Sequence, residues 1–154
     1  MNEGPMIKGN PLKISIYSLL ACYFLGEFVF PKYPLIYLIN LLGVIVFIVS
    51  IIIFCLGFNI FKSYKENPIP TSISRKLIKT GIFSYTRNPI YLSFVMFHFS
   101  MFMVFENVMY LLTAFGLAIW IHNYIIRLEE EYLLKNFSKE YENYMSSVSR
   151  WIFF

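Results

Sequence analysis

The stretch that decides the fold is Gly81-Ile82-Phe83-Ser84-Tyr85-Thr86-Arg87-Asn88-Pro89-Ile90-Tyr91. It joins a basic, polar segment to an apolar run, and Pro89 stands where a helix can begin, because the first helical position needs no amide hydrogen bond. Asn88 is placed to cap that helix through its side-chain oxygen. Arg87 should then lie at the mouth of the helix, where its planar fork of donors can hold a carboxylate or a phosphate.

The composition places this helix in a membrane protein. Of the 154 residues, 58% are hydrophobic and only 14% are charged, which is too apolar for a soluble domain of this size. The net charge of +4 comes from Lys and Arg residues between the apolar runs, as is typical of cytoplasmic loops rather than of nucleic-acid-binding proteins. Cys22 and Cys55 lie inside apolar runs without metal-ligand spacing. We therefore expect a bilayer as partner, with no nucleic acid and no metal.

Four apolar runs are candidates for membrane-spanning helices. They lie at about residues 13–30, 35–61, 89–105 and 108–127. Pro31-Lys32-Tyr33-Pro34 breaks the chain between the first two, and Glu106-Asn107 is a minimal turn between the last two. The sequence thus predicts an all-α integral membrane protein whose four transmembrane helices form two hairpins.

The distribution of basic residues predicts the orientation. The long segment 62–88 is rich in Lys and Arg, whereas the predicted outer turns contain only Lys32. Both termini and the 62–88 loop should therefore face the cytosol. In the tail, 128–154, apolar residues recur every three or four positions, which predicts a cytosolic amphipathic helix. We expect one multi-pass membrane domain over residues 1–154.

Two groups of charged residues fall at the same predicted membrane face. Arg87, followed by Asn88 and Tyr91, opens the third span, and Glu129 and Glu130 follow the fourth. If the hairpins pack side by side, a guanidinium and two carboxylates converge where apolar walls meet the cytosol, which suits a ligand with polar and apolar parts. The alternative is that these residues are only interfacial anchors or salt-bridge partners.

The carboxy-terminal half also resembles a known family. The residues that carry the resemblance are Gly81, Phe83, Tyr85, Arg87, Pro89 and Tyr91, followed by Glu129, Glu130, Leu133, Phe137, Ser138, Tyr141, Tyr144, Val148 and Arg150. In order and spacing they are similar to the motifs of the isoprenylcysteine carboxyl methyltransferase family and its phospholipid methyltransferase relatives. The chain departs from that pattern at Ile82, Asn88, Ser93 and Ser138, where the family usually has Pro, His, Gly and Gly. An Asn can position a ligand as a neutral His does, but it cannot carry charge.

The resemblance implies an enzyme that binds S-adenosylmethionine at the cytosolic face. It points to Arg87, Tyr91 and Glu130 as catalytic residues. The residues expected to bind the cofactor are Phe83, Tyr85, Arg87, Asn88, Pro89, Tyr91, Glu129 and Glu130. Arg87 and the amides after Asn88 could hold the cofactor's carboxylate, the two glutamates its ammonium and ribose groups, and the aromatic rings, together with Tyr132, its adenine.

The sequence indicates the methyl acceptor less directly than the cofactor. A site at a membrane face implies a lipophilic acceptor that enters from the bilayer, such as an isoprenylcysteine-like carboxyl compound, which needs no base. The first alternative is a phospholipid amine, for which Glu130 or Tyr91 is a candidate proton acceptor. The second alternative is a membrane scaffold or lipid-binding protein that keeps the fold without turnover.

Overall fold

The computed structural model describes residues 4–7 and 9–152, so residues 1–3, 8 and 153–154 of the predicted domain lie outside it. The described chain is all helical and contains no strand. The helices are α1 (Pro11–Phe28), α2 (Tyr37–Tyr64), the short 3₁₀ turn η1 (Gly81–Ser84), α3 (Pro89–Phe105), α4 (Val108–Ile121), the π turn η2 (His122–Ile126) and α5 (Arg127–Ser147). The predicted all-α class is confirmed, and each predicted span coincides with a helix to within a few residues.

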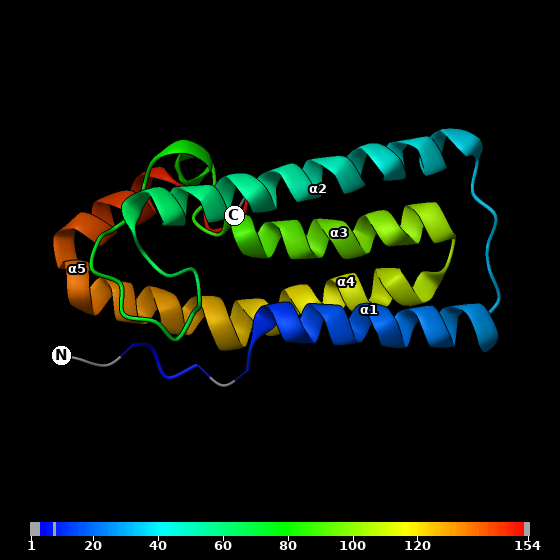
Figure 1. Ribbon diagram of the computed structural model, residues 1–154, viewed down its shortest axis with the longest axis horizontal. Helices are drawn as coiled ribbons and strands as arrows, with labels where there is room; N and C mark the ends of the chain where they lie inside the picture. Colours follow the sequence, from blue (N-terminus) through cyan, green and yellow to red (C-terminus); the bar gives the residue numbers. More distant parts are fainter. Residues whose placement is uncertain (1–3, 8, 153–154) are drawn as a thin grey trace.

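The α3–α4 hairpin lies at the centre of the bundle (Figure 1). α2 packs along α3, and α1 packs along α4. The expectation that α1 and α2 form a tight hairpin of their own is therefore corrected, since each packs mainly on the central pair. The linker between them is held to the α3–α4 turn, because Tyr33 N–H donates to the Glu106 carbonyl (2.9 Å) and Leu35 N–H to the Glu106 carboxylate (3.1 Å).

The contact between α2 and α3 depends on small residues. The buried positions of α2 are Gly43, Ser50 and Gly57, which recur every seventh residue on one face. A Cβ atom on Gly43 would lie 2.7 Å from the Cβ atom of Met103, so only glycine allows this approach. The large residues of α2 are instead exposed, for example Leu38 and Ile52. Small residues inside and large apolar residues outside are typical of helices that pack in lipid.

Within residues 4–7 and 9–152, two helices are long and apolar enough to cross a membrane on their own. They are α2 and the continuous 40-residue run Val108–Ser147, whereas α3 is apolar but shorter. The long run extends from the predicted fourth span into the tail through the π turn η2. It reverses at Ser138, which has φ 42° and ψ −120°, a backbone conformation that glycine adopts at lower energy than serine.

This reversal brings the end of the chain back to the start of α3 (Figure 1). The backbone amide of Arg87 donates to the carbonyl of Ser149 at 3.0 Å. The opening stretch of the sequence and the carboxy-terminal tail therefore meet at the end of the bundle where α3 begins. This end, which holds the candidate site, is named the inner end, and the opposite end, at Glu106, the outer end.

Candidate active site

An ion-pair network joins α3, α5 and the tail. Arg87 donates through Nε (3.1 Å) and Nη2 (2.7 Å) to Oε1 of Glu130. Arg150 donates to the same carboxylate, through Nε to both oxygens (3.1 Å each) and through Nη2 to Oε2. The side chains of Arg87 and Glu130 are only 8% and 9% exposed. The predicted convergence of Arg87 and Glu130 is thus observed.

Arg87 also donates hydrogen bonds to the end of α5 and to the tail. Its Nη1 donates to the backbone carbonyls of Met145 (3.1 Å) and Val148 (2.6 Å). Four of the five guanidinium N–H groups of Arg87 are therefore used inside the protein. These hydrogen bonds hold α5 and the tail against the start of α3.

Asn88 does not cap α3, which corrects the sequence-based expectation. Its side chain makes no capping hydrogen bond, and its Nδ2 instead donates to the carbonyl of Arg150 at 3.0 Å. Thr86 Oγ1 donates to the same carbonyl at 3.1 Å. The Asn88 side chain therefore does not cap the amides of the first turn of α3.

Glu129 lies in a different environment from its neighbour Glu130. It accepts a hydrogen bond from the Tyr91 hydroxyl at 2.9 Å, and no cation among the described residues pairs with it. Burial raises the pKa of Glu129 to about 8; the Tyr91 hydrogen bond opposes this shift, and the charge of Glu130 adds to it. Glu129 also lines a cavity.

Glu130 shows the opposite shift. Burial by itself would raise its pKa, but hydrogen bonds from Arg150 and Arg87 and the charges of the two guanidinium groups lower it below the ordinary value for glutamate. Near neutral pH, Glu130 is therefore ionised, and its oxygens already accept hydrogen bonds from two arginines. Glu129 is mostly protonated at this pH and pairs with no cation among the described residues. Adjacent carboxyl groups with separated pKa values are typical of functional sites.

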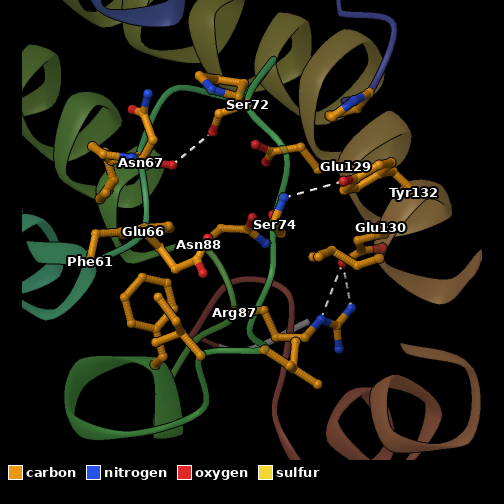
Figure 2. Close-up of a pocket in the computed structure, with 18 of the residues that line it drawn as sticks. Phe61, Glu66, Asn67, Ser72, Ser74, Arg87, Asn88, Glu129, Glu130 and Tyr132 are labelled. Atoms are coloured by element: carbon orange, nitrogen blue, oxygen red, sulfur yellow. Dashed lines mark hydrogen bonds and ion pairs between the residues drawn. The ribbon is translucent and has the colours of Figure 1, made fainter. Parts of the chain in front are cut away.

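A cavity opens between the loop 65–80, the start of α3 and the first half of α5 (Figure 2). Seven predicted site residues line it, namely Phe83, Arg87, Asn88, Pro89, Tyr91, Glu129 and Glu130. Tyr132 also lines the cavity, and its hydroxyl accepts from the Ser74 amide at 3.2 Å. Tyr85 does not line it, because its side chain is 75% exposed just beyond the η1 turn that directs Phe83 inward.

Several lining residues were not predicted from the sequence. The polar ones from the loop are Glu66, Asn67, Ser72, Ser74 and Lys76. Their segment reads only as a basic, proline-broken connection, so nothing in it indicated a contact with the site. Arg150 belongs to the quoted motif, but its spacing does not indicate that it shares a carboxylate with Arg87.

The volume of the cavity is about 110 Å³ with the loop in this position. Pockets that hold drug-sized ligands are roughly 300–1,000 Å³. The loop is held to the rest of the protein by few polar contacts, such as the Ser74–Tyr132 hydrogen bond and the Lys79–Glu140 ion pair at 2.6 Å. Its displacement would enlarge the cavity without breaking the arginine–glutamate network.

Comparison with known proteins assigns the chain to a family. The family of phospholipid methyltransferases matches over residues 37–140, which is more than half of the chain. The match includes α2, α3, α4, the loop and both glutamates, and it stops before the returning tail. No curated protein matches the chain. The chain belongs to the phospholipid methyltransferase family of membrane methyltransferases.

Proposed function

We propose that this protein transfers a methyl group from S-adenosylmethionine to a lipophilic acceptor at the cytosolic face of a membrane. The observation that supports this most is one cavity lined by Arg87, Tyr91, Glu129 and Glu130, at the polar end of an otherwise apolar bundle. The family match supplies methyl transfer as the reaction class.

The lining residues fit the parts of this cofactor. The uncapped amides at the start of α3 suit its carboxylate, and the second Nη2 hydrogen of Arg87 can add to them. Phe83 and Tyr132 offer aromatic walls for the adenine of the cofactor. When bound, S-adenosylmethionine would supply the electrophilic methyl group.

Alignment is the main demand on the protein in such a displacement, and it can contribute roughly 7–11 kcal/mol in favourable cases. Because Arg87 and Glu130 already satisfy each other, we assign them to positioning: they fix the start of α3 relative to α5. Tyr91 and Glu129 face the cavity as a hydrogen-bonded pair and are the groups best placed to contact the acceptor.

The raised pKa of Glu129 favours an amine as the methyl acceptor, such as the amino group of a phospholipid headgroup. An amine must be neutral to attack and loses a proton when the new C–N bond forms. In its ionised form, which becomes the major form as the pH rises past about 8, Glu129 can accept that proton. Glu130 is less suited, because its oxygens already accept from two arginines. An isoprenylcysteine-like carboxylate would need no base and is the second candidate acceptor.

The proposed placement in the membrane follows the charge pattern. All four long apolar helices would cross the bilayer, both termini and the cavity would face the cytosol, and the acceptor would enter laterally. Basic residues of the loop, such as Lys65 and Arg75, are then at the surface of the inner leaflet.

Calorimetric titration of detergent-purified protein with S-adenosylhomocysteine tests cofactor binding. Saturable binding to the wild-type chain, weakened at least tenfold in Arg87→Ala and Glu130→Gln, is the expected result. A wild-type protein that is folded but does not bind would favour the scaffold alternative. Transfer of radiolabel from the cofactor to phosphatidylethanolamine, rather than to a base-labile methyl ester, separates the two acceptors.

A further inference from the structure

A second cavity, of about 330 Å³, lies beside the returning tail. It is lined by Arg87, His122 and the residues from Met145 to Trp151. It shares only Arg87 with the first cavity, since Glu129, Tyr91 and the loop residues contribute nothing to it. The proposed methyl transfer assigns no role to this cavity.

The charges around this cavity are unbalanced. Its lining contains the guanidinium groups of Arg87 and Arg150 but no Asp or Glu. The carboxylate next to them, Glu130, is a single negative charge shared by both arginines. Two guanidinium groups that share one carboxylate leave this cluster with one excess positive charge among the described residues. The side chain of Arg87 is buried, whereas that of Arg150 is 28% exposed.

His122 adds a second, independent sign that an acceptor is missing. Arg150 Nη1 approaches its Nε2 at 3.2 Å, and Trp151 Nε1 approaches its Nδ1 at 3.4 Å. Both approaching atoms are obligatory donors, whereas a neutral imidazole has only one acceptor nitrogen. In either tautomer, one N–H of the ring faces another N–H. Three donor groups thus converge where the protein itself provides too few acceptors.

We propose that this cavity binds a phosphate-type oxyanion through Arg150, His122 and Trp151. A tetrahedral oxyanion supplies several acceptor oxygens and the missing negative charge, and arginine binds such groups through paired, charge-assisted hydrogen bonds. Ser146, Ser147 and Ser149 line the same cavity, although the hydroxyl groups of Ser146 and Ser147 donate to backbone carbonyls of α5. Binding would tie the tail to the end of α4.

The source of the oxyanion is either a lipid headgroup or free phosphate. The first source rests on the proposed function, in which this end of the bundle lies at the inner membrane surface, where phospholipid phosphates are abundant. The site would then hold the phosphodiester of a membrane lipid beside the cofactor cavity. The chemistry of recognition is the same in both cases.

The chain contains two tryptophans, so Trp120→Phe leaves Trp151 as the only indole and as a reporter inside the site. Its emission is followed while inorganic phosphate, and separately a short-chain phosphatidic acid, is added in detergent at constant ionic strength. We expect a saturable change in emission with at least one of them. Arg150→Gln should weaken it roughly tenfold, because charge-assisted hydrogen bonds are lost. Saturation by both probes identifies the oxyanion as the ligand, and saturation by the lipid alone identifies a headgroup site.

Arg127→Gln is the matched control, since this arginine is exposed on the neighbouring turn and lines neither cavity. It should leave the titration unchanged. If Arg150→Gln does not fold, His122→Leu serves instead and should also weaken binding. No saturation by either probe, or equal saturation in the wild-type chain and the site variants, would overturn the proposal. The titrations contain no cofactor, so their outcome is readable even if S-adenosylhomocysteine does not bind.

Discussion

The two ends of the bundle each hold a hydrogen-bonded polar cluster, but only one has the features of an active site. At the outer end, the Glu106 carboxylate accepts from Leu35 N–H and from Asn40 Nδ2 at 3.0 Å, and it fastens the first linker to the central hairpin. At the inner end, two carboxylates with opposite pKa shifts border a cavity. The comparison shows that a polar group in a membrane bundle is not by itself a sign of chemistry. What distinguishes the inner end is a carboxyl group without a cationic partner beside empty space.

Glu130→Gln should produce the largest effect, because it leaves Arg87 and Arg150 without their shared counterion. Breaking a buried pair costs roughly 3–5 kcal/mol, and we expect loss of S-adenosylhomocysteine binding together with a large fall in the unfolding temperature in detergent. Glu106→Gln is the matched change at the outer end. It should leave cofactor binding unaltered, since Gln can still accept from Asn40. Equal loss of binding in both variants would remove the distinction between the two ends.

Glu129→Gln should lower the rate of methyl transfer to an amine by about 10²–10⁴, the usual contribution of a positioned base. In the wild-type enzyme, the rate should rise with pH through about 8 as Glu129 loses its proton. The variant should lack this limb of the pH–rate profile. A carboxyl acceptor would show no such loss, so an unchanged rate and profile would reject Glu129 as the base.

The same residue predicts the pH dependence of stability. Because the pKa of Glu129 is higher in the folded protein than its ordinary value of 4.5, the folded state binds more protons between these limits. The free energy of unfolding should therefore decrease as the pH rises from about 4.5 to about 8. Glu129→Gln should flatten this decrease in thermal unfolding measured at several pH values. A variant with the same pH dependence as the wild type would show that the shift is not real.

Asn107→Ala tests the outer cluster. Its side chain accepts from Met109 N–H at 2.9 Å and donates to the Gly26 carbonyl at 2.7 Å, so it caps α4 and holds α1. Losing a cap and a buried hydrogen bond costs roughly 1–3 kcal/mol. Unfolding in mixed micelles should show this loss, while the affinity for S-adenosylhomocysteine measured below the unfolding temperature should not change. A loss of affinity would mean that the two ends are coupled.

Ser138→Gly should have the smallest effect and the opposite sign. Glycine adopts the observed φ of 42° without strain, so the variant should be more stable by about 1 kcal/mol or less. Asn136→Gly, two residues earlier in the helical part of α5, is the control and should be destabilising by roughly 0.5–1 kcal/mol. Destabilisation by both substitutions would indicate that the reversal at Ser138 is not strained.

The sequence predicted the helices and the meeting of Arg87 with Glu130, because hydrophobic runs and the spacing of the motif carry that information directly. It did not predict how α1 and α2 pack. Their places are decided by small residues such as Gly43 and by hydrogen bonds at Glu106, whose partners are distant in the chain. The role of Asn88 was predicted wrongly because a local cap competed with the Arg150 carbonyl, which only the folded tail brings near. The sequence could not predict the different protonation states of Glu129 and Glu130, because it shows only two adjacent glutamates.

Photo-crosslinking with an azido-adenine derivative of S-adenosylmethionine tests most directly whether the inner cavity holds the cofactor. The label should attach to peptides from the loop, residues 66–78, or from the start of α5, residues 129–133, both of which line the cavity. Excess S-adenosylhomocysteine should prevent the labelling. Two results would contradict the account. One is labelling around Asn40 or Glu106, at the outer end, that S-adenosylhomocysteine prevents. The other is a folded protein in which S-adenosylhomocysteine prevents no labelling.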